Sequence, residues 1–158
     1  MSVDSVSVEE QAAAAADFTN GLVDAFGVDA EVSTRREDED VVIVDIEGSD
    51  LGLLVGPKGA TLQAIEELVR TVVQRRTEGH GARIHVDVGG YRAKRRAALE
   101  RFVLDLAERV RESGEDRALE PMSASDRKVV HDAVGTVDGV TTTSEGEEPR
   151  RRVVVRPG

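Results

Sequence analysis

The stretch LLVGPKGATLQAIEELV, Leu53–Val69, places two glycines, a proline and a lysine between a short apolar run and an amphipathic helix. Helix N-termini expose unpaired backbone N–H groups and carry positive partial charge, which suits phosphate. Glycines at both ends of Gly56-Pro57-Lys58-Gly59 let a sugar–phosphate backbone approach closely, and Lys58 adds a mobile cation. The stretch therefore predicts a loop that takes a phosphate backbone; the simpler alternative is a turn.

The loop does not match the Walker motif of nucleotide triphosphatases. That motif, G-x-x-x-x-G-K-[ST], has its lysine directly after the last glycine, whereas Lys58 precedes Gly59. The sequence has no cysteine, and neither paired carboxylates with metal spacing nor a Ser/His/Asp set stands out. A binding protein is therefore favoured over an enzyme, and no cofactor or metal is indicated.

The segments on either side of the loop predict a mixed α/β unit in the order helix, strand, strand, helical turn, loop, helix, strand. Residues 1–8 are expected to be a flexible polar tail, and 36–40 a charged turn. The expected bounds are helices 9–26, 51–55 and 60–76, and strands 28–35, 41–48 and 82–88. The residues expected to be buried in the last helix and strand are Leu62, Ile65, Leu68, Val69, Val72, Ile84, Val86 and Val88.

A second unit is expected after Gly89-Gly90. Its elements are helices 91–114 and 124–134, with short strands at 117–119, 138–143 and 151–156 and a turn at 145–151. The buried stripe of its first helix is expected to consist of Leu99, Phe102, Val103, Leu106 and Val110. The whole chain therefore belongs to the mixed α/β (α+β) class.

The segment V-G-P-K-G-A-T-L between two helices resembles the G-x-x-G signature of KH domains, and the element order resembles their type II variant. The resemblance implies that four single-stranded nucleotides lie between the loop and the sheet edge. The residues it implies as RNA contacts are Val55, Gly56, Pro57, Lys58, Gly59 and Leu62. Ile65 and part of the strand 41–46 could add an apolar floor, although most of these residues are expected to be core.

A second motif lies in PMSASDRKVVHDAV, Pro121–Val134. Arg127 and His131 are four residues apart and so project from one face of a helix, which Ser123 or Ser125 could cap. Together with the downstream TTTSEGEEPRRRVVV, this pattern resembles the R-3-H domain, a small α/β module that binds single-stranded nucleic acid. Arg127 could then bind phosphate in a forked manner, with Lys128 adding charge and His131 donating or stacking. The alternative is a surface pair, with His131 packed against a strand.

A type II KH domain followed by an R-3-H domain resembles the bacterial Jag (SpoIIIJ-associated) family over about residues 9–157. The expected domains are 9–89 and 90–158. Longer family members carry a separate N-terminal Jag domain, for which we expect no room here, so functions that depend on it are not carried over. The resemblance implies a regulator or chaperone of transcripts, links to cell envelope growth or division, and pairing with a small stand-alone KH protein.

The net charge of −10 is unevenly distributed. Residues 1–50 hold 14 acidic and 2 basic side chains, whereas residues 51–158 hold 17 acidic and 19 basic ones. A nucleic acid responds to the local field within a Debye length of ~8–10 Å, so a basic patch remains usable. The start of the helix 91–114 concentrates accessory basic residues, for which the alternative is pairing with 37–40 or Glu100. These residues are Arg92, Lys94, Arg95 and Arg96.

No apolar run approaches the ~18 residues of a membrane span, and the first residues lack the pattern of a signal peptide. We therefore expect a cytoplasmic protein without membrane insertion. The leading hypothesis is binding of single-stranded RNA, with single-stranded DNA left open as a second ligand. The alternative is an adaptor that docks a protein partner through its acidic N-terminal half without direct RNA binding.

Overall fold

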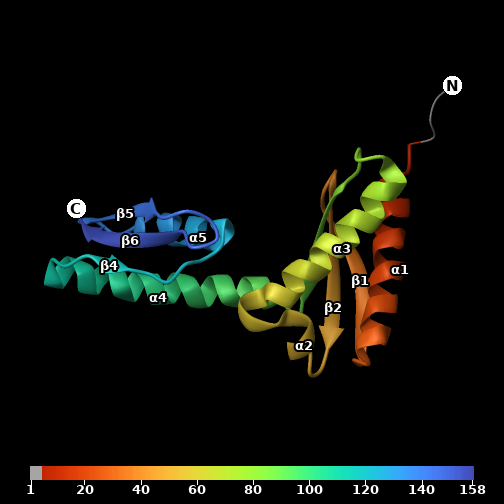
Figure 1. Ribbon diagram of the computed structural model, residues 1–158, viewed down its shortest axis with the longest axis horizontal. Coiled ribbons are helices and arrows are strands. Elements are labelled where there is room, and N and C mark those ends of the chain that lie inside the picture. Colours follow the sequence, from red (N-terminus) through yellow and green to blue (C-terminus); the bar gives the residue numbers. More distant parts are fainter. Residues whose placement is uncertain (1–4) are drawn as a thin grey trace. The chain divides into compact units, whose positions relative to one another are not determined.

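The computed structural model describes residues 5–158, which form two compact units, one within 1–92 and one over 93–158 (Figure 1). Each unit combines helices with a three-stranded sheet, as the mixed α/β class predicts. Of the expected tail at 1–8, residues 1–4 lie outside the described part of the chain. Val8 at its other end already belongs to the first helix.

The first helix, α1 (Val8–Phe26), starts with a capping box. The Ser7 hydroxyl accepts the N–H of Glu10 at 3.1 Å, and the Glu10 carboxylate accepts the N–H of Ser7 at 2.9 Å. The helix ends at Gly27 in the left-handed conformation, φ 70°. These two caps explain why the helix begins before the predicted residue 9 and ends where the sequence predicts.

The sheet of the first unit has the order β1-β2-β3, formed by β1 (Ala30–Asp38), β2 (Val41–Gly48) and β3 (Arg83–Val88). β1 and β2 form an antiparallel hairpin, and β3 pairs with β2 in parallel. The helices α1, α2 (Gly52–Val55) and α3 (Ala60–Thr77) cover one face of this sheet (Figure 1). The core between them consists mainly of Val42, Val44, Ile46, Leu54, Leu62, Ile65, Val69, Val73, Ile84, Val86 and Val88.

Two expectations for this unit were wrong. β1 continues through Asp38, so most of the predicted charged turn at 36–40 is strand; Arg35 and Arg36 form ion pairs with Asp45 and Glu9 there. Leu68 is 50% exposed rather than buried. The buried positions of α3 follow the spacing 62, 65, 66, 69 and 73, which places residue 68 toward solvent and makes Glu66 a buried residue.

The second unit contains most of α4 (Tyr91–Ser113) and α5 (Ala124–Val134) against a sheet of order β4-β6-β5. Its strands are β4 (Arg117–Ala118), β5 (Val140–Glu145) and β6 (Arg152–Pro157), and both pairings are antiparallel. The buried core includes Val103, Ala107, Val110, Val130, Val134, Val153 and Val155. Phe102, predicted as core, is 58% exposed, because Ala107 completes the buried stripe with Val103 and Val110.

Candidate nucleic-acid interface

The loop between α2 and α3 has an unusual backbone. A short 3-10 turn, Pro57–Gly59, joins the helices, and Gly56, Lys58 and Gly59 have φ values of 71°, 54° and 79°. A left-handed conformation costs a residue with a side chain about 1–2 kcal/mol, so Lys58 is held there by its surroundings. No side chain caps the start of α3, whose N-cap is Gly59. The loop thus presents the start of a helix without a side-chain acceptor.

The side chains predicted for this site differ in their exposure. Pro57 and Lys58 are exposed, and Val55 is half-buried. Leu62, by contrast, is 2% exposed and belongs to the core, as does Ile65. Leu62 therefore supports the loop from beneath and is not an open contact surface, because the apolar face of α3 points into the sheet.

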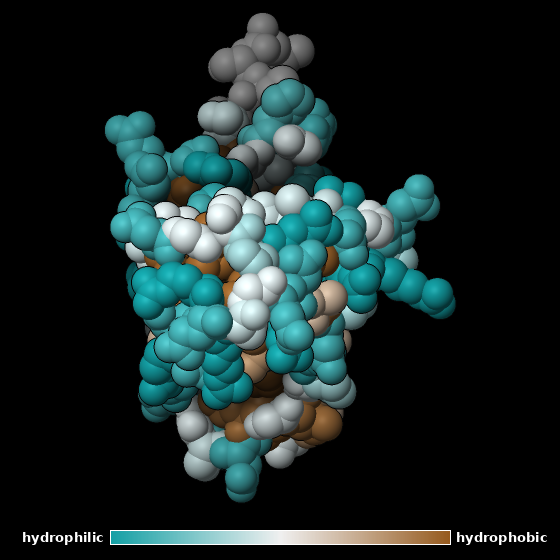
Figure 2. All heavy atoms as spheres, turned by 90° about the vertical axis from the view of Figure 1, so that its left-hand side faces the viewer, coloured by the Kyte–Doolittle hydropathy of each residue, from teal (hydrophilic) through white to brown (hydrophobic). Residues whose placement is uncertain are grey.

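An apolar surface that the sequence did not predict lies next to the loop. Leu53 on α2 is 61% exposed. Hydrophobic residues also show, in brown, on the face of the protein drawn in Figure 2. An apolar residue in a short helical turn gives no sign of its exposure in the sequence, so only the packing of α2 identifies it.

A buried carboxylate joins α3 to the edge strand β3. Glu66 Oε1 accepts the N–H of Val86 at 3.0 Å and lies 2.9 Å from Nη2 of Arg92. His85 Nδ1 lies 3.3 Å from the same oxygen, and Nη2 of Arg70 is 3.2 Å from Oε2. Glu66 therefore gathers two guanidinium groups and a backbone donor at one place. The available sequence signal was a glutamate on the apolar face of α3, four residues before Arg70.

The outer edge of β3 is covered by side chains. Arg70 Nε donates to the carbonyl of Ile84 at 2.8 Å, and Arg92 Nε donates to that of Val86 at 3.1 Å. The side-chain oxygen of Gln11 accepts the N–H of Ala82 at 2.7 Å. These contacts satisfy backbone groups that an edge strand otherwise presents to a further strand.

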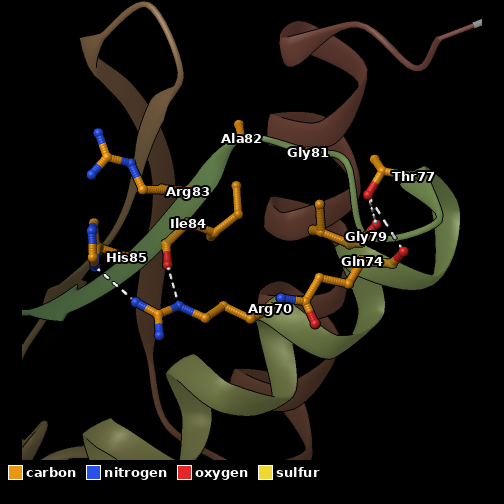
Figure 3. A pocket seen from close by; sticks show the side chains of 10 residues that line it. Arg70, Gln74, Thr77, Gly79, Gly81, Ala82, Arg83, Ile84 and His85 are labelled. Carbon is orange, nitrogen blue, oxygen red and sulfur yellow. Dashed lines mark hydrogen bonds between the residues drawn. The ribbon is translucent and has the colours of Figure 1, made fainter.

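A pocket of about 380 Å³ lies between the C-terminal half of α3 and the start of β3 (Figure 3). Arg70 reaches across from α3 to Ile84 and His85, and Gln74 and Thr77 line the helix side. The side chain of Arg83 points away from α3, whereas His85 Nδ1 lies 3.1 Å from Nη2 of Arg70 on that helix. The pocket is therefore lined by both polar and apolar side chains, and it lies at the end of α3 remote from the Gly56–Gly59 loop.

The accessory basic residues are mostly engaged within the protein. Arg92 is bound to Glu66, Arg95 donates to Asp126 at 2.9 Å, and Arg96 pairs with Glu100 at 3.0 Å. Pairing with Glu100 was the alternative foreseen for this cluster. Lys94 is exposed, and within residues 5–158 it has no hydrogen bond or ion pair. The cluster is thus largely structural, and Lys94 offers its charge to solvent.

The second motif lies on α5, whose N-terminus Ser123 caps by accepting the N–H of Asp126 at 3.3 Å. Arg127 is 8% exposed; its Nη1 donates to the carbonyl of Met122 at 2.7 Å, and its Nη2 pairs with Glu148. The guanidinium group, predicted to bind phosphate, is therefore occupied by protein groups. The reason is that the connection between β5 and β6 brings Glu148 to this face of α5.

The other two residues of this motif differ in their surroundings. His131 Nδ1 lies 2.6 Å from the hydroxyl of Thr142 on β5, so the alternative of a histidine packed against a strand describes its position. Lys128 is exposed and bonds to Asp132 at 2.7 Å. The hydrogen bond from Lys128 holds the pKa of Asp132 below its usual value. Lys128 is therefore the exposed cation of the motif.

Comparisons with known proteins match both units. The KH domain family of KhpA/KhpB matches residues 12–88, and the R-3-H domain family matches residues 97–157. The chain belongs to the Jag family. The Gly56–Gly59 loop lies inside the KH match, and α5 lies inside the R-3-H match. The residues 89–96, with Tyr91 and the basic cluster, lie between the two matched ranges.

Several Jag-family relatives are similar over most of this chain. RNA-binding protein KhpB of Clostridium symbiosum is 32% identical over 142 residues, 89% of this chain and 64% of the relative. The KhpB proteins of Streptococcus pneumoniae strain D39 and Bacillus subtilis strain 168 are 30% and 33% identical, over 94% and 77% of this chain. The alignments cover 44% and 59% of those two relatives. The chain thus spans less than two thirds of the length of these relatives.

Two other kinds of feature are absent from the described part of this Jag-family chain. Among residues 5–158, no helix is long and apolar enough to cross a membrane. The same residues contain no cluster of histidine and carboxylate side chains with the geometry of a metal site.

Proposed function

We propose that this chain is a binding protein, not an enzyme, and that it binds single-stranded RNA through the Gly56–Gly59 loop and the exposed side of α5. The observation that carries the proposal is the backbone of the loop within a KH domain. It has three positive φ values and Lys58 exposed at its tip, and it leads into a helix without a side-chain cap. The names of the relatives, all RNA-binding proteins, support the same ligand.

At the loop, the chemistry is that of an anion at a helix N-terminus. The first N–H groups of α3 carry the positive end of the helix dipole, and Lys58 adds a full charge beside them. The glycines remove the side chains that would hold a sugar–phosphate backbone away. Exposed apolar surface at Leu53 and part of Val55 lies close enough along the chain to contact a base.

At α5, Lys128 provides an accessible charge, whereas Arg127 and His131 are already hydrogen-bonded within the unit. A phosphate that reaches Arg127 must share it with Glu148 or displace that carboxylate. We infer that Lys128 makes the first contact and that Arg127 and His131 contribute once Glu148 moves. Lys94 provides a further exposed positive charge for the bound RNA.

The cellular role follows the family resemblance. We propose a cytoplasmic regulator or chaperone of transcripts that is linked to cell envelope growth or division and pairs with a small stand-alone KH protein. Single-stranded DNA is the second ligand, and its affinity is to be compared with that of single-stranded RNA. The adaptor alternative, in which the acidic N-terminal half docks a protein without RNA, is an outcome of the experiment below.

The test is binding of short single-stranded RNA at several salt concentrations. We expect Lys58→Asp to weaken binding and to lower the slope of log K against log salt by about 0.7, the value for one phosphate contact on a single strand. Arg109→Glu is the matched control, since it changes net charge equally at an exposed side chain outside both proposed sites. Absence of wild-type binding near physiological salt would favour the adaptor. Equal losses in both variants would mean that net charge, and not the Gly56–Gly59 loop, governs RNA binding.

A further inference from the structure

The second glycine of the loop lies against an aromatic ring. An ideal Cβ on Gly59 would stand 2.9 Å from Cε1 of Tyr91 and 3.4 Å from its hydroxyl oxygen. The glycine is therefore needed for two reasons, its φ of 79° and the closeness of the ring. Tyr91 covers one side of the loop, although the two residues are far apart in the sequence.

The position of Tyr91 is itself well determined. The residue is half-buried and packs against the core of the first unit, and it follows two glycines with positive φ, Gly89 and Gly90. The next residue, Arg92, is bound on three sides. Its partners are Asp87 Oδ1 at 3.3 Å from its N–H, the Val86 carbonyl at 3.1 Å from Nε, and Glu66 Oε1 at 2.9 Å from Nη2. The backbone that carries the ring is therefore tied to β3 and α3.

The backbone of the loop is held by hydrogen bonds from the Gly56 N–H to the Gly52 carbonyl at 3.0 Å and from the Gly59 N–H to the Gly56 carbonyl at 3.2 Å. Two of its four residues are glycines, and no side-chain cap stabilises its junction with α3. Glycine loses more conformational entropy on ordering than any other residue. A ligand that needs one loop conformation therefore binds more weakly unless the protein already holds the loop in that conformation. A rigid ring packed on Gly59 restricts the loop to one conformation before the ligand binds.

We propose that Tyr91 is a positioning residue for RNA binding, because its ring holds Gly56–Gly59 in the conformation that accepts a phosphate backbone. The inference rests on the proposed function of that loop. It assigns Tyr91 a role through Gly59 and Lys58 and no base contact of its own.

The first measurement is RNA affinity. Without the ring, the RNA must itself order the Gly56–Gly59 loop on binding. We therefore expect Tyr91→Ala to weaken RNA binding about tenfold. Tyr91→Phe keeps the ring and is the matched control, with an expected change below about twofold. Thermal unfolding of each variant reports folding, and Tyr91→Leu, which retains an apolar side chain at the core, replaces Tyr91→Ala if that variant does not fold.

A double-mutant cycle separates positioning from direct contact. If Tyr91 acts by placing Lys58, then Lys58→Ala costs much less in the Tyr91→Ala background than in the wild type. Additive losses would overturn the proposal, because they would mean that Tyr91 acts independently of the loop. Wild-type affinity in Tyr91→Ala would also overturn it.

A spectroscopic readout is available because Tyr91 is the single tyrosine of the sequence. Protein labelled with 3-fluorotyrosine gives one ¹⁹F resonance. We expect it to shift on addition of a short RNA, and to shift only at higher RNA concentration in Lys58→Asp. An unchanged resonance in wild-type protein that binds RNA would count against the inference alone. Failure of wild type to bind RNA would overturn the proposed function, and the inference with it.

Discussion

At the level of single residues, Gly56 is the loop position least tolerant of a side chain. Its φ of 71° and ψ of 178° lie in a region open almost only to glycine, and a Cβ would stand 2.2 Å from Oγ1 and 2.9 Å from the backbone nitrogen of Thr61. We expect Gly56→Ala to lower the free energy of unfolding by about 1–3 kcal/mol. Urea denaturation measures this change, and RNA affinity is expected to fall with it.

Gly21 provides the opposite case. It lies inside α1, and a Cβ placed on it would meet nothing within 4 Å. Gly21→Ala is therefore expected to raise the free energy of unfolding by roughly 0.5–1 kcal/mol, the helix preference of alanine over glycine. Destabilisation of similar size in both variants would contradict the special role given to Gly56.

Glu148 offers a second prediction at this scale. Its carboxylate pairs with Arg127, where a phosphate is proposed to bind. Glu148→Gln is expected to tighten RNA binding by roughly threefold, since the competing charge-assisted bond is lost. The control is Glu147→Gln, a neighbour with the same charge whose exposed side chain makes no hydrogen bond or ion pair within residues 5–158.

Fluorescence anisotropy with a labelled RNA measures both variants. Equal effects of the two substitutions would show that only net charge matters. Weaker binding by Glu148→Gln would mean that Glu148 holds Arg127 in place and does not compete for it.

At the level of elements, the contact between α3 and β3 depends on Glu66. Replacing its carboxylate weakens bonds to two guanidinium groups and to the buried N–H of Val86. Leaving such groups poorly satisfied costs about 1–3 kcal/mol, which we expect for Glu66→Ala in urea denaturation. Glu67→Ala, at the exposed neighbouring position, is expected to change stability by no more than about 0.5 kcal/mol. Similar losses in both would argue against this network.

The order and type of the elements followed from hydrophobic periodicity and β-branched runs, which are local properties of the chain. Which face of each helix is buried was less predictable. Leu68 and Phe102 have suitable spacing for a buried face, yet both are exposed, because Glu66 and Ala107 occupy the neighbouring positions that face the sheets. β1 extends into a charged segment because Arg35 and Arg36 find acidic partners on β2 and α1.

At the level of the whole molecule, the uneven charge distribution bears on RNA association. Glu31 and Glu47 lie directly opposite each other on β1 and β2, and β2 leads into α2 and the loop. Converting both to glutamine is expected to speed RNA association at low salt a few-fold, and to stabilise the hairpin by about 0.2–1 kcal/mol by relieving a like-charge pair. Stopped-flow association measures the rate.

The control for this prediction is the pair Glu112→Gln and Glu115→Gln, which changes net charge by the same amount in the second unit. The same acceleration in both double variants would mean that the average charge of −10, and not the local field around the loop, governs association.

The sequence by itself determined the two motifs and the helical segments that carry them. Gly56-Pro57-Lys58-Gly59 sits between two helical segments, and Arg127 and His131 are one helical turn apart, because spacing along a helix and glycine in a tight loop are local physical rules. The same rules predicted the α/β class and the succession of elements.

Only the tertiary structure decided what surrounds each of these residues. Arg92 meets Glu66, Arg127 meets Glu148, and Tyr91 lies on Gly59, although these partners are 21 to 32 positions apart in the sequence. No periodicity encodes such pairs, since they arise when separate helices and strands pack against a common core. That packing turns three of the four expected accessory cations into ion-pair partners within the protein, and leaves Lys58, Lys94 and Lys128 exposed.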